Sequence, residues 1–159
     1  LAEQKGEIAF DAPGGPFRLG AKADRIELMA DGSAVIVDYK TGTPPSGDQV
    51  KTGLSPQLTL EAAMLLAGGF PDVRADSIRA LEYMQLSGGA EAGKLRTVFK
   101  ADAATAAAQE ALARFKAYVA AFDQADMPYL SKPHVLLERH EGDYDHLARV
   151  KEWGSEGGE

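Results

Sequence analysis

The sequence predicts a single α/β domain with a mixed central sheet flanked by helices. Strand-like and helix-like segments alternate along 159 residues, of which 45% are hydrophobic and 26% are charged. This composition is typical of a globular domain large enough to bury a core, and it excludes collagen-like, coiled-coil and wholly disordered classes. We expect residues 1–153 to form one domain, cut from a longer protein because the chain starts at Leu1 in mid-pattern, and residues 154–159 to form a flexible tail.

The first forty residues are predicted to form a three-stranded meander. Residues 7–10 can form a short strand, and the run Pro13-Gly14-Gly15-Pro16 suits a turn. Apolar and polar residues partly alternate over residues 17–28, which is the period of a strand with one buried face. Asp31-Gly32 then marks a hairpin turn, and the β-branched run over residues 34–39 fits a buried strand.

A loop and a helix are predicted after the meander. Residues 41–53 are rich in glycine, proline and polar residues, so we expect them to form a loop. Ser55 followed by Pro56 predicts a helix with Ser55 as its N-cap and proline at its first position. This helix should run to Gly68-Gly69 and, because it is strongly apolar, pack against the meander.

Two more strands and a long helix are predicted next. Residues 78–86 and 95–100 resemble strands joined across residues 88–93. Asp102 can cap a helix that runs to about Asp126. Its predicted apolar face has helical spacing and consists of Ala108, Leu112, Phe115, Val119 and Phe122.

Charge and cysteine content exclude several classes of function. The net charge of −7 argues against a tight nonspecific nucleic-acid binder, but not against a nuclease, whose metal-binding carboxylates add negative charge. With no cysteine the chain cannot form a disulfide, a thiolate nucleophile or an iron-sulfur cluster. It has neither an apolar run of about 20 residues nor a signal peptide, so we expect a cytoplasmic protein without membrane contact.

Two carboxylates and one ammonium are predicted to converge at the end of the second predicted hairpin. If its strands pair through the Asp31-Gly32 turn, Asp24 and Asp38 can approach on one sheet face, and Lys40, two residues on, points the same way. Such oxygen ligands hold Mg²⁺ or Mn²⁺, and the backbone carbonyl of Tyr39 could complete the coordination. This set fits the cleavage of a phosphodiester.

A purely structural interpretation of these residues stays open. An aspartate at a strand end is commonly a turn former, a lysine after it a solvated edge residue, and two aspartates at this spacing can occur by chance. The segment V-I-V-D-Y-K nevertheless places Asp38 on an apolar strand. Burying an unpaired carboxylate there costs several kcal/mol, and this calls for a cation.

The motifs resemble a known nuclease family. A-D-R-I-E-L, D-Y-K-T-G and P-Q-L are similar to the nuclease motifs of the RecB-like branch of the PD-(D/E)xK superfamily, in particular to the C-terminal nuclease domain of AddB subunits of bacterial helicase-nucleases. A-L-E-Y-M-Q-L-S-G-G and Y-D-H-L-A-R-V-K-E-W extend the similarity over most of the chain. The resemblance implies a PD-(D/E)xK nuclease-like fold and an exonuclease that processes double-strand breaks in DNA beside an AddA-type helicase subunit.

The resemblance also implies roles for single residues. Asp24 and Asp38 would hold Mg²⁺, for which Mn²⁺ can substitute, and Lys40 would be the catalytic lysine. Gln57 would orient groups at the site or contact DNA. Family members often have an aromatic residue four positions after this glutamine, where the chain has Glu61. Glu61 either faces the site or is a solvated helix residue.

Two departures from the family pattern and a rival function follow. Without cysteine the chain would belong to a branch that lacks the iron-sulfur cluster. The family tends to place a His or Glu on a helix before the first strand, and few residues precede that strand here, so the fragment can lack one residue of the site.

The rival function is an inactive structural or DNA-guiding module that binds the helicase subunit. The intact aspartates and lysine argue against it.

Other candidate sites are weaker. His134, His140 and His146 lack the spacing of a helical zinc site, and we expect them to be surface or packing residues. They are spaced by six residues in a region expected to be irregular after Pro128, apart from a last helix expected over residues 143–153. No phosphate-binding G-x-x-x-x-G-K-[ST] loop is present, so ATP hydrolysis is not expected from this chain.

Overall fold

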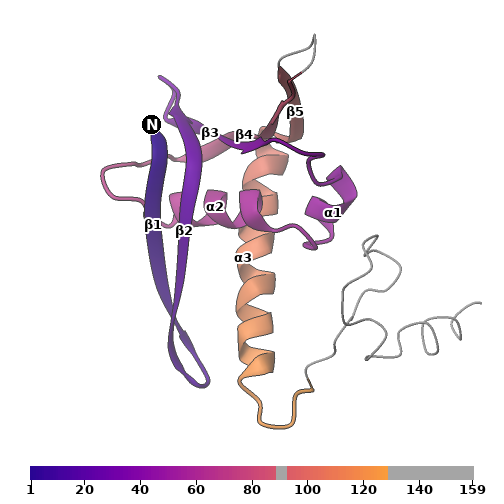
Figure 1. The fold of residues 1–159 in the computed structure, drawn as a ribbon. Helices are drawn as coiled ribbons and strands as arrows, with labels where there is room; N and C mark the ends of the chain where they lie inside the picture. Colours follow the sequence, from indigo (N-terminus) through magenta and orange to yellow (C-terminus); the bar gives the residue numbers. More distant parts are fainter. Residues whose placement is uncertain (89–92, 129–159) are drawn as a thin grey trace, which may run out of the picture. The chain divides into compact units, whose positions relative to one another are not determined.

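The computed structural model describes residues 1–88 and 93–128, which form one five-stranded sheet and three helices (Figure 1). The sheet order is β1-β2-β3-β4-β5; β3 and β4 are parallel and the other neighbours are antiparallel. The predicted α/β fold with a mixed sheet is confirmed. In chain order the elements are β1 (Ala2–Ala12), β2 (Gly15–Leu28), β3 (Ser33–Lys40), α1 (Gly47–Lys51), α2 (Gln57–Leu66), β4 (Ser77–Leu86), β5 (Gly93–Lys100) and α3 (Asp102–Phe122).

The first three strands form the predicted meander. β1 and β2 pair along nearly their whole length and turn at Pro13-Gly14. β1 begins at Ala2, earlier than the predicted strand over residues 7–10, because its polar first half is held by pairing with β2. At the second turn the Asp31 carboxylate accepts hydrogen bonds from the Ser33 N–H and hydroxyl, at 3.0 and 2.6 Å. This closes the hairpin between β2 and β3.

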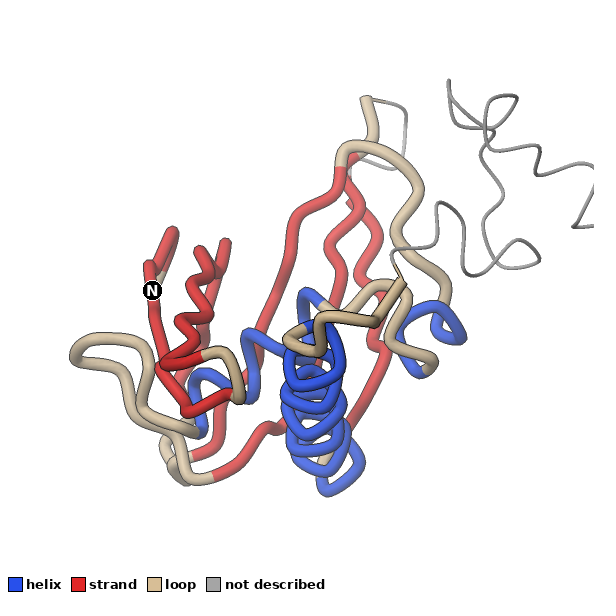
Figure 2. The backbone as a smooth tube through the Cα atoms, turned by 90° about the horizontal axis from the view of Figure 1, so that it is seen from below, coloured by secondary structure: helices blue, strands red, loops and turns tan. Residues whose placement is uncertain are grey.

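β3 is buried on both faces of the sheet. Ile36 lies in the main core with Leu58 of α2, on the face that α2 and α3 cover (Figure 2). Val35 and Val37 pack with Ala80 on the other face. Because β3 and β4 are parallel, the chain must cross over between them, and α1 and α2 lie in that crossover. The polar end of β3 therefore meets the start of α2 at one edge of the sheet.

A short helix replaces part of the predicted loop over residues 41–53. α1 begins after Ser46, whose hydroxyl accepts a hydrogen bond from the Gln49 N–H at 3.1 Å, while the Gln49 side chain accepts one from the Ser46 N–H at 2.7 Å. This reciprocal capping satisfies two amides that would otherwise lack partners. Val50 then anchors the helix in the core. The prediction of a plain loop was wrong because five residues show no helical period.

The ends of the two longer helices differ from the prediction. The residue that caps α2 is Pro56, not Ser55, and it makes no side-chain capping hydrogen bond. The N-cap of α3 is Ala101, with φ at +50°, and not Asp102. Asp102 lies in the first turn, where its negative charge interacts favourably with the positive end of the helix dipole. α3 ends at Phe122. Phe122 was predicted to belong to the apolar face of the helix, but it is 40% exposed, so that face is only partly buried.

The middle of α3 anchors the β1–β2 hairpin. Ala108 is fully buried and Leu112 packs against the core, as predicted from their spacing. Phe115 lies edge-on to Phe10 and Phe17, with ring centroids 6.3 and 5.7 Å away. Such edge-to-face contacts stabilise the packing beyond the buried area.

Gly69 approaches β1 so closely that a side chain there is expected to destabilise the fold. A Cβ on Gly69 would lie 2.6 Å from the Ile8 Cγ2 and 2.9 Å from the Glu7 carbonyl oxygen. We therefore expect Gly69→Ala to lower the free energy of unfolding by about 1–3 kcal/mol, measured by urea denaturation. Gly88→Ala is the control, because a Cβ there meets nothing within 4 Å. Equal stability of the two variants would contradict this prediction.

Some predictions lie outside the described residues. These are the helix over residues 143–153, the tail over residues 154–159, the three histidines and the motif Y-D-H-L-A-R-V-K-E-W. All the elements above belong to the compact unit Leu1–Gln124. Within residues 1–88 and 93–128, no helix is both long and apolar enough to cross a membrane.

Candidate active site

The end of β3 places a buried carboxylate at the edge of the sheet. Asp38 is 1% exposed, and it lies on the helix-covered face because it is two residues beyond Ile36. It is next to Tyr83 of β4 in the parallel register. Burial raises the pKa of Asp38, and the charge of Asp24 adds to this, whereas Lys40 and Gln57 oppose it. The carboxylate is therefore held where water solvates it poorly.

Lys40 and Gln57 hold the Asp38 carboxylate from two sides. The Lys40 Nζ lies 3.1 Å from Oδ1 and 2.9 Å from Oδ2; only the contact with Oδ1 has hydrogen-bond geometry, and the contact with Oδ2 is an ion pair. The Gln57 Nε2 donates to Oδ1 at 2.8 Å, and the Gln57 Oε1 accepts from the Lys40 Nζ at 3.2 Å. Gln57 is the first residue of α2, so the crossover helix supplies the third group of the site. The structure brings these three predicted residues into contact.

Asp24 lies where β2 separates from β3. The pairing of the two strands runs to Arg25 opposite Val37, and Asp24 comes next along β2. Its Oδ2 accepts a hydrogen bond from the Tyr39 N–H at 2.9 Å, so a side chain replaces the main-chain partner at this point. The charge of Asp24 raises the pKa of both Asp38 and Glu61, as expected for neighbouring carboxyl groups.

The neighbourhood of Tyr39 is fixed by its side chain as well as its N–H. The Tyr39 hydroxyl accepts a hydrogen bond from the Arg25 Nη1 at 3.1 Å, and Arg25 also pairs with Glu27 at 2.5 Å. Tyr39 is 37% exposed. The predicted role of the Tyr39 carbonyl as a metal ligand stays a prediction.

Glu61 is a further buried polar group, whose role the sequence left undecided. It lies one helical turn after Gln57 and is 2% exposed, so it is not a solvated helix residue. Its Oε1 accepts a hydrogen bond from the Gln57 Nε2 at 3.1 Å, and its Oε2 is buried without a hydrogen-bond partner. Burial raises its pKa from an ordinary 4.5 to about 7. The sequence signal was the spacing of four residues from Gln57, which puts both side chains on one helix face.

Tyr83 closes the site on the side of β4, and sequence reasoning did not single it out. It is 1% exposed, and burial raises its pKa to about 12, with smaller contributions from Asp38 and Glu61. Tyr83 therefore stays neutral next to the carboxyl groups. The only available signal was a tyrosine within an apolar strand, which more often indicates core packing.

The donor atoms of this site fit a divalent cation. Carboxylate oxygens are the hard ligands that Mg²⁺ and Mn²⁺ prefer, and Asp38 Oδ2 and Glu61 Oε2 are buried without hydrogen bonds. Within the described ranges, no three His, Cys, Asp or Glu side chains are already placed around one point. Asp24 and Asp38 would hold the ion, with the remaining positions filled by water or main-chain oxygen.

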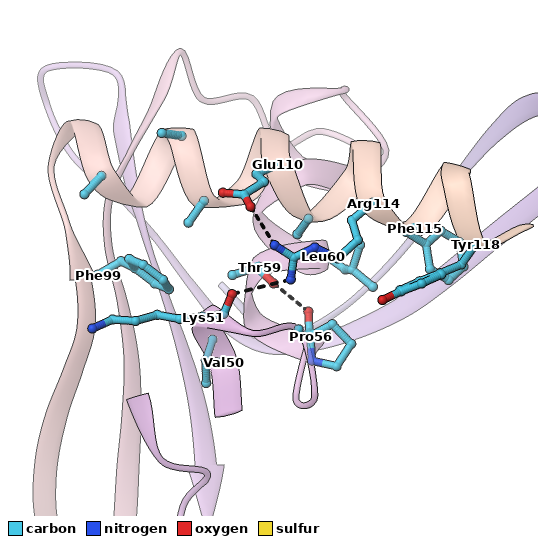
Figure 3. Close-up of a pocket in the computed structure, with 15 residues that line it drawn as sticks. Val50, Lys51, Pro56, Thr59, Leu60, Phe99, Glu110, Arg114, Phe115 and Tyr118 are labelled. Atoms are coloured by element: carbon cyan, nitrogen blue, oxygen red, sulfur yellow. Dashed lines mark hydrogen bonds and ion pairs between the residues drawn. The ribbon is translucent and has the colours of Figure 1, made fainter. Parts of the chain in front are cut away.

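An apolar pocket of about 290 Å³ lies elsewhere, between α1, α2 and α3 (Figure 3). Alanines of α3 line it together with Phe99 and Tyr118. Arg114 pairs with Glu110 at 2.6 Å and donates to the Lys51 carbonyl at 3.4 Å. None of Asp24, Asp38, Lys40, Gln57 and Glu61 lines this pocket. We therefore assign it to the packing between the helices and not to the candidate active site.

The stability of the protein should depend on the ionisation of Glu61. A pKa raised from 4.5 to about 7 means that the folded state holds a proton that the unfolded state releases, so stability is lost as the pH rises from about 4.5 to about 7. Glu61→Gln cannot ionise and should therefore gain up to about 3 kcal/mol relative to the parent across this window. Urea denaturation at several pH values measures the difference. A difference that stays constant with pH would contradict the prediction.

Comparison with known proteins supplies the family. The model of the PD-(D/E)XK nuclease superfamily matches residues 2–134, which include every residue of the site described above. The chain belongs to the PD-(D/E)XK nuclease superfamily. Within the matched residues, Asp38-Tyr39-Lys40 has the D-x-K spelling from which the sequence predicted the site, and Asp24 precedes it on the neighbouring strand.

Relatives of this PD-(D/E)XK chain are much longer proteins. An uncharacterized protein of Rickettsia conorii is 44% identical over 68 residues, which are 43% of this chain and 8% of the relative. An uncharacterized protein of Rickettsia typhi is 42% identical over 85 residues, which are 54% of this chain and 10% of the relative. A solved structure titled "Crystal structure of SSO0001" has 10% identity and a TM-score of 0.43, covering 83% of this chain and 54% of the other.

Proposed function

We propose that this PD-(D/E)XK chain is a Mg²⁺-dependent deoxyribonuclease that hydrolyses phosphodiester bonds. The observation that carries the proposal is the contact set of Asp38, Lys40 and Gln57, with Asp24 bound to the adjoining Tyr39 N–H. Three carboxyl groups, of Asp24, Asp38 and Glu61, interact electrostatically with one another, and one ammonium, that of Lys40, contacts Asp38. Their excess negative charge is of the size that one divalent cation offsets.

Each residue has a chemical task in this proposal. A divalent cation, when bound, neutralises the phosphate and favours the ionisation of water. Lys40 stabilises the negative charge that develops on the phosphate as water attacks phosphorus and one P–O bond breaks. Asp38 and Gln57 hold the Lys40 ammonium in place, at 2.9–3.2 Å. Water supplies the hydroxyl group on phosphorus, and in the overall reaction its other hydrogen is transferred as a proton to the leaving oxygen, which departs as a hydroxyl group.

We further propose that the chain acts as an exonuclease domain in the processing of double-strand breaks. Its motifs resemble those of AddB nuclease domains, whose partner is an AddA-type helicase subunit. The matched segments are only 8–10% of the Rickettsia relatives, which supports a nuclease domain within a longer protein. The ATP-dependent motor and most of the DNA path would then lie in other domains.

Cleavage of labelled DNA tests the proposal directly. The protein is incubated with end-labelled linear DNA, covalently closed circular DNA and RNA of equal length, with Mg²⁺, with Mn²⁺ or with EDTA. We expect linear DNA to be degraded from its ends with either metal, and all cleavage to stop in EDTA. A folded protein that binds DNA or a helicase subunit but cleaves none of these substrates would instead be the inactive binding module.

A further inference from the structure

We propose that Glu61 is a positioning residue that fixes the side-chain amide of Gln57 and, through it, the ammonium of Lys40. The inference rests on the proposed nuclease function and adds a residue to its machinery. Glu61 touches neither Lys40 nor Asp38 by hydrogen bond; its one hydrogen bond comes from the Gln57 Nε2, at 3.1 Å. Its action on the site therefore passes through Gln57.

The contacts of Gln57 allow only one orientation of its amide. The Nε2 donates to two carboxylate oxygens, of Asp38 and Glu61, and the Oε1 faces the Lys40 ammonium. A rotation of the amide by 180° would place its oxygen against two carboxylates and its NH₂ group against the ammonium. The contacts with Lys40, with Asp38 and with the ionised form of Glu61 would all become repulsive, so the two carboxylates together lock the amide.

Of the two carboxyl groups that bind the Gln57 amide, Glu61 is the one that accepts no other side-chain hydrogen bond. Asp38 Oδ1 is shared between the Lys40 ammonium and the Gln57 amide, and Asp38 would also give oxygen to a cation. The Oε1 of Glu61 accepts from Gln57 alone. When Asp38 is engaged elsewhere, Glu61 still keeps the Gln57 oxygen turned toward Lys40.

The surroundings of Glu61 show that it does not serve the stability of α2. Its helix neighbours Ala62, Met64 and Leu65 are buried, and an apolar residue would pack here without leaving an unpartnered oxygen. No lysine or arginine of the described chain forms a salt bridge with it. A buried acid that lowers stability and binds one site residue is typical of a group kept for function.

Two variants of Glu61 separate its hydrogen bond from its charge. Glu61→Gln and Glu61→Leu both remove the charge, but only Glu61→Gln keeps an oxygen that can accept from Gln57. We expect kcat for DNA cleavage to fall about tenfold in Glu61→Leu with KM little changed, and Glu61→Gln to recover most of that loss. Thr59→Val is the control on the same helix, because it removes a buried hydroxyl that bonds only to Pro56.

A measurement that needs no activity follows the Gln57 amide itself. Side-chain amide hydrogen exchange, recorded by NMR, should be slowest in the parent, similar in Glu61→Gln and about tenfold faster in Glu61→Leu. Circular dichroism verifies the fold, and Glu61→Met replaces Glu61→Leu if leucine does not fold. If the parent cleaves no DNA, the proposed function fails, and the exchange rates alone decide whether Glu61 holds Gln57.

Two results would overturn the inference. Equal losses of kcat in Glu61→Gln and Glu61→Leu would mean that the charge matters and the hydrogen bond does not. Unchanged Gln57 exchange in Glu61→Leu would mean that Asp38 alone orients the amide.

Discussion

Replacing Lys40 by alanine is expected to reduce DNA cleavage about a hundredfold, the effect of removing one positioned electrostatic group worth on the order of 3 kcal/mol. The Lys40 ammonium is the only cation that contacts Asp38 in the described part of the chain, at 2.9 Å. Alanine removes this charge from the phosphate without filling its space. Single-turnover cleavage of end-labelled DNA, with metal in excess, measures the loss.

Lys100→Ala is the matched control for this experiment. Lys100 ends β5 opposite Ala80 and forms no salt bridge within residues 1–88 and 93–128, so its removal changes the net charge equally without touching the site. In a complete helicase-nuclease, Lys40→Ala should leave ATP hydrolysis and unwinding at the parental rate. Parental cleavage by Lys40→Ala would place the chain among inactive binding modules.

Asp38→Asn is expected to abolish stabilisation by metal while leaving the metal-free fold at least as stable as the parent. Burial raises the pKa of Asp38, so the ionised carboxylate costs stability, and an amide of the same shape avoids this cost. When the Asp38 charge is lost, the Lys40 ammonium stays accessible to water, because the Lys40 side chain is 32% exposed. Breaking a buried ion pair is costly when it leaves one charge buried without a partner, and the exposed Lys40 ammonium avoids this cost.

The size of the metal effect follows from mass action. A ligand at 100 times its Kd stabilises the folded state by about 2.7 kcal/mol, and for a chain of this size that raises Tm by about 5–10 °C. We expect this shift with Mn²⁺ in the parent and in Asp11→Asn, an exposed control on β1. An undiminished shift in Asp38→Asn would locate the metal elsewhere.

Local patterns predicted the strands and the core better than the helix ends. The alternation along β2 and the β-branched run of β3 are consequences of burial, so they are visible in the sequence. The parallel pairing of β3 with β4 is not, because an apolar strand carries no sign of the direction of its neighbour. α1 was missed because its only signal was the capping pair Ser46 and Gln49.

The candidate site was predictable where side chains share one element. Asp38 and Lys40 follow the two-residue period of a strand, and the structure places both beside Gln57. Asp24 was harder to place, because the fully buried residues on either side of it, Ala23 and Ile26, are three positions apart. The two-residue alternation of buried and exposed side chains along β2 is therefore broken at this point. The burial of Glu61 depends on which face of α2 packs against the sheet. That helix is apolar on most sides, so its sequence does not indicate this face.

The hydrogen bonds of the site join residues that are close along the chain. Asp24 and Tyr39 are 15 residues apart, Lys40 and Gln57 are 17 apart, and Asp38 and Gln57 are 19 apart, whereas the bond from Gly14 to Asp123 joins residues 109 apart. The entropy lost in closing a loop grows with the logarithm of its length, so a site contact costs about 1.5 kcal/mol less to close than the contact with Asp123. During folding we therefore expect the hydrogen bonds of the candidate site to form before the far end of α3 docks against Gly14.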